Sequence, residues 1–389
     1  MINKINQTIE EHFSEMIEIR RYLHQHPELS FKEYKTAAFI ANYYDKLGIP
    51  YRKNVGGNGV IATLTGGLPG KTIAFRADFD ALPIHDEKDV PYRSQVDGVM
   101  HACGHDGHTA ILLTLAKVLQ KFQDQLPGNV VFLHQHAEER TPGGARSMID
   151  DGALDNVDAV FGAHLWATEE LGVLQTSKNV LMAGADRFEI TIQGKGGHGA
   201  VPHQTKDAVV IGAEVVLSLQ KIISRQLDPL ATAVLTIGKF DAGNDFNIIA
   251  DQAKLIGTVR YLQQDVQTQM MNDMERIING ICLSHGCSYE MDYEEGYPPL
   301  INHETEAEVV RQAASKIEDL KMVEEIQPMM SSEDFSYYLL EKPGAYFFIG
   351  AKKAGHDYPH HHPKFDFDER VMPMIAKTFA QTYLDYQKM

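Results

Sequence analysis

The sequence predicts an α/β protein in which a mostly parallel sheet flanked by helices is interrupted by a smaller α+β domain. In the first part of the chain, short apolar runs bounded by Gly, Pro and Asp alternate with segments of helical periodicity, which is typical of a parallel sheet covered on both faces. The middle of the chain changes to the order β-α-β-β-α-β, a compact unit of the ferredoxin-like kind. A length of 389 residues also favours two domains over one.

Residue periodicity predicts each element of the larger domain in turn. Apolar residues at helical spacing, beginning with Ile5 and Ile9, predict an amphipathic helix over 5–24, and a second helix follows over 32–47. The segment 109–123 is also predicted to be helical. Short runs rich in β-branched or aromatic residues predict buried strands at 59–64, 72–78, 129–135, 158–164 and 345–350.

The inserted domain is predicted from the change of rhythm in the middle of the chain. Its expected elements are a strand at 186–193, a helix at 207–226, strands at 231–243 and 253–262, a helix at 266–286 and a strand at 287–297. We therefore expect residues 1–184 and 298–389 to form the larger domain and residues 185–297 to form the insertion.

Composition excludes several classes of partner. The formal net charge of −17 argues against binding to nucleic acid or to an anionic membrane surface. No apolar run approaches the roughly 18 residues that span a bilayer, and the first residues lack the apolar core of a signal peptide. The chain has only three cysteines, an odd and small number that does not suit a disulfide framework. This count fits a reducing compartment, so we expect a cytoplasmic protein.

Potential metal ligands gather in four places along the chain. Three of these places follow the end of an apolar strand: the histidine-rich clusters at 134–139 and 356–362, and the single His164. The fourth is a cluster at 101–108, which precedes a helix. In open α/β sheets the carboxyl ends of the strands are where ligands bind. Thiolate, imidazole and carboxylate together suit zinc and other first-row divalent ions. The sequence therefore predicts a metal centre at this edge of the sheet.

Two pairs of acidic residues complete the predicted centre. Glu138 and Glu139 are neighbours in an extended stretch, so one can bind metal while the other faces a water molecule and takes its proton. Asp78 and Asp80 are expected to orient the metal ligands by hydrogen bonding. A plain salt bridge with Arg76 is the alternative for these two aspartates.

Together these motifs resemble the dinuclear-metal aminoacylase and carboxypeptidase superfamily, whose catalytic domain is zinc-exopeptidase-like. Within it the chain is most similar to the branch of hippurate hydrolase and the plant indole-acetyl-amino-acid hydrolases. The resemblance runs nearly end to end, and its most specific segments are RRYLHQHPELSFKE (20–33), HACGHDGH (101–108), GKGGHGAVPH (194–203), MSSEDFSYY (330–338) and HHPKFDFDE (361–369).

The resemblance implies a set of metal ligands and a catalytic base. Two divalent metal ions per chain are expected, zinc or manganese first and cobalt or nickel as alternatives. Glu138 matches the general base, and His361 matches the last ligand because the family has His, one residue and then Pro. The implied ligands are Cys103, His105, Glu139, His164 and His361.

The inserted domain then matches a lid and dimerisation domain. Its His198 matches a histidine thought to reach the active site of the partner subunit and to stabilise the tetrahedral intermediate. Asn247 and Arg260 match residues that hold the substrate carboxylate, for which a guanidinium is well suited. A homodimer or a higher homo-oligomer is therefore expected.

The activity implied is hydrolysis of the amide bond of N-acyl amino acids by a metal-bound water, with Glu138 as the base. Three alternatives stay open. The first is another enzyme of the same mechanism, either a dipeptidase or carboxypeptidase or an N-acetyl-diaminopimelate deacetylase. The second is a hydrolase that uses Cys103 as its nucleophile and would not respond to chelators. The third is a non-catalytic metal- or ligand-binding protein.

Overall fold

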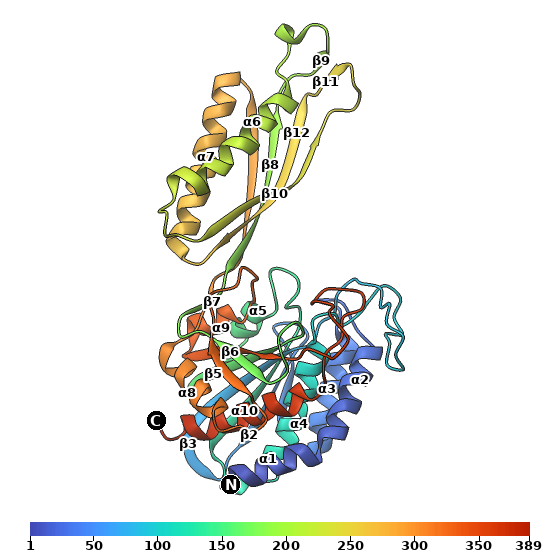
Figure 1. The fold of residues 1–389 in the computed structure, drawn as a ribbon, viewed down its shortest axis with the longest axis vertical. Coiled ribbons are helices and arrows are strands. Elements are labelled where there is room, and N and C mark those ends of the chain that lie inside the picture. The colour runs from blue at the N-terminus through green and yellow to red at the C-terminus, as the bar shows by residue number, and fades with distance from the viewer. The chain divides into compact units, whose positions relative to one another are not determined.

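The computed structural model describes residues 1–389, which divide into two compact units (Figure 1). The first unit comprises Met1–Leu181, Leu300–Gln327 and Glu333–Met389, and the second comprises Met182–Pro299 and Pro328–Ser332. Residues 185–297 all lie in the second unit, and the lid and dimerisation roles predicted for them stay predictions. None of the helices combines the length and the apolar character that crossing a membrane requires.

The first unit is built on an eight-stranded sheet of order β1-β2-β4-β3-β5-β16-β6-β15. The four central strands β4, β3, β5 and β16 run parallel to one another, whereas β2 pairs antiparallel with both β4 and β1. Parallel central strands are covered on both faces, which is why their sequences are almost continuously apolar. The strands are β1 Tyr51–Val55, β2 Gly59–Thr65, β3 Leu68–Asp78, β4 Pro127–Gln135, β5 Ala159–Trp166, β6 Val173–Thr176, β15 Met322–Glu325 and β16 Gly344–Gly350.

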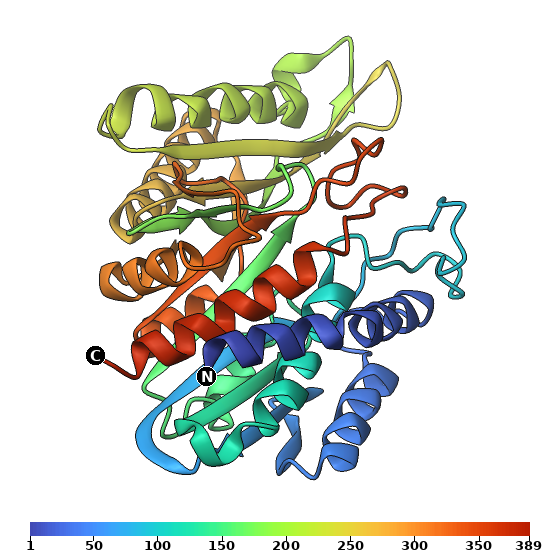
Figure 2. The same cartoon turned by 60° about the horizontal axis from the view of Figure 1, so that its bottom comes forward.

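Helices cover this sheet, and the first and last of them pack together (Figure 2). The single helix predicted over 5–24 is wrong in one respect, because the chain forms two helices with a break at His12, whose amide bonds back to both Thr8 and Ile9. The helices are α1 Ile2–Glu11, α2 Phe13–Gln25, α3 Tyr34–Leu47, α4 His105–Gln120, α5 Ala145–Asp150, α8 Glu304–Ala314, α9 Ser336–Glu341 and α10 Val371–Tyr386.

The second unit is a four-stranded antiparallel sheet of order β10-β12-β8-β13 with two helices packed against it (Figure 1). Alternate residues of β8, among them Phe188, Ile190 and Ile192, are buried beneath the helices. A two-stranded pair, β9 Gly197–His198 and β11 Ile248–Ile249, stands beyond the sheet. The other elements are β8 Gly184–Gln193, α6 Ala208–Lys221, β10 Ala233–Ala242, β12 Gln252–Tyr261, α7 Gln264–His285 and β13 Ser288–Tyr297.

Candidate functional site

Two aspartates at the carboxyl end of β3 orient two histidines on the first turn of α4. The Asp80 carboxylate accepts a hydrogen bond from Nδ1 of His105 at 3.1 Å, and Asp78 accepts one from Nδ1 of His108 at 2.6 Å. Nε2 of His108 is also engaged, because it accepts the backbone N–H of Leu165 at 3.1 Å. Nε2 of His105 is buried and has no hydrogen-bond partner. Of this pair, only His105 therefore has a ring nitrogen left over for a ligand.

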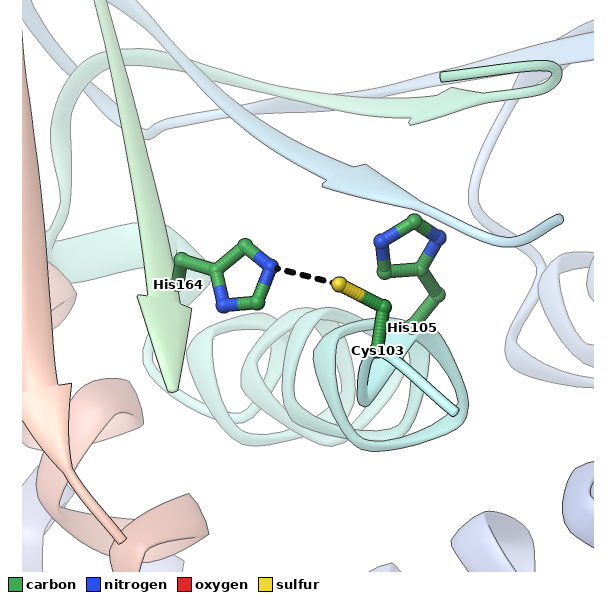
Figure 3. Close-up of side chains that lie close together, drawn as sticks. All are labelled: Cys103, His105 and His164. Atoms are coloured by element: carbon green, nitrogen blue, oxygen red, sulfur yellow. Dashed lines mark hydrogen bonds between the residues drawn. The ribbon is translucent and has the colours of Figure 1, made fainter. Parts of the chain in front are cut away.

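His164 of β5 presents the same kind of lone pair from the neighbouring strand. Its Nδ1 donates to the carbonyl oxygen of Leu165 at 2.6 Å, which leaves Nε2 to face Cys103 Sγ at 3.3 Å. Figure 3 shows the side chains of Cys103, His105 and His164 converging from β5 and from the start of α4. A fixed tautomer of this kind is what a metal-binding histidine requires.

The two glutamates follow β4 after a sharp bend. Ala137 has a positive φ of 53°, and its amide donates to the Glu33 carboxylate at 2.9 Å. The Glu139 amide donates to Asp80 at 2.9 Å. With the backbone held at both points, the Glu138 and Glu139 carboxylates approach His105 Nε2 to 4.0 Å and 3.9 Å.

The loop after β16 brings in the last histidine. The amide of His361 donates to the carbonyl of Ala102 at 2.8 Å, and its Nε2 lies 3.2 Å from Glu139 Oε1 without an aligned hydrogen bond. The other two histidines of the run have acceptor nitrogens already in use, because His360 Nε2 accepts the amide of Ala167 and His362 Nδ1 accepts that of Lys364.

Electrostatics at this cluster favour a bound cation. Burial, together with the carboxylates of Glu139 and Glu138, raises the pKa of Cys103 well above its ordinary value. Burial and the charge of Glu333 likewise raise the pKa of Glu138. Burial opposes a charge on His105, but Asp78 and Asp80 outweigh it and raise its pKa to about 10. Negative charge is thus concentrated where the donor atoms converge.

The donor atoms of this cluster could hold divalent metal ions, and Cys103 belongs to two of the possible ligand groups. Of the five groups whose own ligand atoms all lie within 4.8 Å of one another, two contain Cys103. Among their atoms, His105 Nε2 and Glu139 Oε1 are buried without a hydrogen-bond partner. Sulfur, imidazole and carboxylate together suit zinc and similar ions. The two groups are Cys103–His105–His164 and Cys103–Glu139–His361, and Glu138 joins His105 and Glu139 in a third.

Asp78 forms the salt bridge with Arg76 and also bonds His108, while its predicted function of orienting a metal ligand stays a prediction. Its Oδ1 accepts from His108, and its Oδ2 pairs with the buried guanidinium of Arg76 at 2.5 Å. Sequence reasoning assigned no function to Glu33 or to His360. The only signal for Glu33 was its place at the end of the motif at 20–33, and His360 could not be told apart from its two neighbours.

The three remaining predicted residues lie in the second unit. His198 is on β9 and is exposed, and the carbonyl of Asn247, in the loop before β11, accepts the amide of Gly199 at 2.8 Å. That loop borders a hollow of about 580 Å³. Arg260 is half-buried on β12 and donates to Ser332 at 3.2 Å. Their part in the site stays a prediction.

Comparison with known proteins points in one direction. Residues 74–385 match the model of peptidase family M20/M25/M40. The YhaA protein of Bacillus subtilis is 53% identical over 388 residues, 99% of this chain and 98% of that protein. An N-acyl-L-amino acid amidohydrolase of Geobacillus stearothermophilus is 46% identical over 301 residues, 77% of this chain and 81% of that protein. The crystal structure of the YxeP protein of Bacillus subtilis, a dinuclear metal-binding peptidase from the M20 family, is 32% identical with a TM-score of 0.84 and covers 97% of this chain and 99% of that one.

Proposed function

This chain belongs to peptidase family M20/M25/M40, and from that premise we propose that it hydrolyses the amide bond of N-acyl amino acids. The predicted family, the α/β fold and the assignment as a hydrolase are confirmed by the matches. One observation carries the proposal furthest: the shared Cys103 joins two groups of donor atoms, and the Glu138 carboxylate lies beside both.

Each residue of the cluster has a function in this proposal. Cys103, His105, Glu139, His164 and His361 hold two divalent cations, zinc or manganese first. Bound there, the cations supply polarisation of the amide carbonyl and a lowered pKa for a water molecule. Glu138 takes the proton of the attacking water and passes it to the departing amine. Asp78 and Asp80 keep the α4 histidines in place by hydrogen bonds to Nδ1 of His108 and His105.

The second unit supplies the groups that recognise substrate in this proposal. His198 stabilises the oxyanion of the tetrahedral intermediate, and Asn247 and Arg260 hold the substrate carboxylate. Asn247 follows β10, whose last residue Ala242 pairs with Ala253 at the start of β12, whereas Arg260 is seven residues beyond Ala253 on β12. At ~3.3 Å per residue Ala253 and Arg260 are about 23 Å apart. A small substrate cannot touch both in one copy, so we infer that two copies contribute to each site.

A panel of substrates on metal-free and reconstituted protein tests the reaction. N-acetyl, N-benzoyl and indole-acetyl amino acids are offered alongside dipeptides, with zinc or manganese added back. Hydrolysis of the N-acyl amino acids that depends on metal supports the proposal, and a preference for dipeptides favours the peptidase alternative. Activity that survives removal of metal would contradict the metal-dependent mechanism and favour Cys103 as the nucleophile.

The variant Glu138→Gln tests the base in the same assay. We expect kcat to fall by about 10²- to 10⁴-fold, because the carboxylate that moves the proton is lost. Metal content should stay unchanged, since Glu139 and the other ligands remain. Glu290→Gln, an exposed position in the second unit, is the matched control and should behave as the native enzyme does. Full activity in Glu138→Gln would remove this residue from the mechanism.

A further inference from the structure

His360 lies beside the cysteine sulfur with its Nδ1 facing that atom. The backbone N–H of Ala167 donates to His360 Nε2 at 3.0 Å, so this nitrogen carries a lone pair. The proton of the neutral ring is then on Nδ1. Nδ1 lies 3.7 Å from Cys103 Sγ, within hydrogen-bonding range of a sulfur acceptor.

Aromatic neighbours hold the His360 ring in this orientation. The ring centroid lies 4.7 Å from that of Trp166 and 4.9 Å from that of Phe365. The His164 ring meets it edge-on at 5.2 Å. Contacts on several sides, together with the bond to the Ala167 amide, leave the ring little freedom to turn its Nδ1–H away from the sulfur.

His360 and His164 present opposite groups to the same sulfur. His164 Nδ1 is used as a donor to a backbone carbonyl, so its Nε2 offers Cys103 a lone pair at 3.3 Å. His360 uses its lone pair on a backbone amide, so it offers an N–H. A lone pair can share a cation with the sulfur, whereas an N–H can only donate to it. Of these two neighbouring histidines, His164 can therefore act as a metal ligand and His360 as a hydrogen-bond donor.

We propose that His360 is a positioning residue that donates a hydrogen bond from Nδ1 to the thiolate of Cys103. This inference rests on the proposed function, in which Cys103 is a metal ligand. A hydrogen bond to a ligating sulfur withdraws electron density from it, which weakens its donation to the metal and leaves the metal a stronger Lewis acid. The histidine run thus supplies a ligand, His361, and beside it a group that tunes the sulfur.

Two substitutions at position 360 separate the two hydrogen bonds of the ring. In His360→Asn the amide nitrogen falls where Nδ1 was, so it can still donate to the sulfur while the bond to the Ala167 amide is lost. In His360→Gln the amide group falls where Nε2 was, so its oxygen can accept the Ala167 amide while the sulfur loses its donor. Both variants are checked for native secondary structure by circular dichroism.

The readout is the absorption of the full chain loaded with cobalt(II), recorded at equal cobalt content. A thiolate ligand gives a sulfur-to-cobalt charge-transfer band. We expect this band at the native wavelength in His360→Asn and at a longer wavelength in His360→Gln, because a thiolate without its donor releases an electron more easily. Cys103→Ser should abolish the band and identifies its origin.

Every other outcome overturns the inference. An unchanged band in both variants would mean that Nδ1 donates elsewhere, for example to the backbone of Cys103, which also faces the ring, and the proposed function would stand. Equal shifts in both variants would mean that ring packing matters and the donor does not. A native protein without the band, or a band that persists in Cys103→Ser, would remove the sulfur from the ligand set, and the Glu138→Gln assay would then judge the hydrolysis separately.

Discussion

Glu33 is a fully buried carboxylate that holds the bend before the proposed base. It accepts the side chain of Asn58 and the amide of Ala137, each at 2.9 Å. Ala137 adopts the left-handed backbone region, which a residue with a Cβ seldom occupies without support. Glu33 therefore stabilises the backbone conformation from which Glu138 and Glu139 project.

Glu33 also makes the stability of the protein depend on pH. Burial, with the nearby charge of Asp80, raises its pKa from 4.5 to about 7, so the folded state binds this proton more tightly than the unfolded chain does. The stability that the proton provides is complete below about pH 4.5 and is lost as the pH rises through about 7, by up to about 1.4 kcal/mol per pH unit.

The variant Glu33→Gln should lack this dependence. In urea unfolding between about pH 5 and pH 8, the free energy of unfolding of the native protein should fall relative to that of the variant. The exposed substitution Glu290→Gln should instead run parallel to the native protein. If the curves of native protein and Glu33→Gln were parallel, Glu33 would be ionised throughout and the bend would not depend on its proton.

At this scale the sequence predicts which residue types gather but not the direction in which each atom faces. Cys103, His105 and His164 could be predicted as neighbours, because strand ends and the start of a helix meet at one edge of a parallel sheet. Which histidine nitrogen carries the proton depends on the backbone groups of Leu165 and Ala167. Those backbone groups come into position only when the chain folds, so the proposed donor function of His360 could not be predicted from the sequence.

At the scale of elements, Arg76 joins β3 to the turn that precedes α9. Its buried guanidinium pairs with Glu333 at 2.9 Å and with Asp334 at 3.0 Å, in addition to Asp78 on its own strand. Gln135 at the end of β4 donates to Asp334 at 2.8 Å. Three carboxylates are thus kept inside the protein by one cation and a small number of hydrogen bonds.

The variant Arg76→Met should be strongly destabilised. Removing one partner of a buried ionic network leaves uncompensated charge, which costs about 3–5 kcal/mol, whereas an exposed pair is worth about 0–1 kcal/mol. Arg370→Met is the matched control, because Arg370 is 67% exposed and also pairs with an aspartate. Guanidinium unfolding of metal-free protein measures both. Equal small losses would show that the three carboxylates take up protons and no longer need the arginine.

The sequence predicts the central elements well and the peripheral ones poorly. The strands predicted at 72–78, 129–135, 158–164 and 345–350 are mostly apolar, because they are buried on both faces. β1 and β15, which lie at the two edges of the sheet, were not predicted, since partly exposed strands such as Tyr51–Val55 carry polar residues. Helix α4 begins at His105, four residues before the predicted start at 109. The prediction missed this first turn because it carries the polar residues of the site and lacks an apolar pattern.

At the scale of the whole molecule, the second unit presents its predicted functional residues at two ends. β9 and β11, which carry or adjoin His198 and Asn247, stand together at one end of that unit, whereas Arg260 is near the other end of β12 (Figure 1). A single copy cannot place both ends against one small substrate. The arrangement therefore predicts that each active site takes Arg260 from one chain and His198 from another.

Mixing two inactive variants tests this prediction directly. Glu138→Gln lacks the base and His198→Ala lacks the group proposed to stabilise the oxyanion, so each alone should lose activity by about 10²-fold or more. If His198 acts in the partner's site, a mixed dimer has one site in which both residues are intact. After subunit exchange an equal mixture should then regain about a quarter of native activity, because half of the dimers are mixed and each has one complete site. Mixing Glu138→Gln with the double variant Glu138→Gln, His198→Ala should restore nothing. If the first mixture stayed inactive, with mixed dimers verified by mass, His198 would act in the site of its own chain, and an active His198→Ala protein by itself would show that His198 takes no part in the reaction.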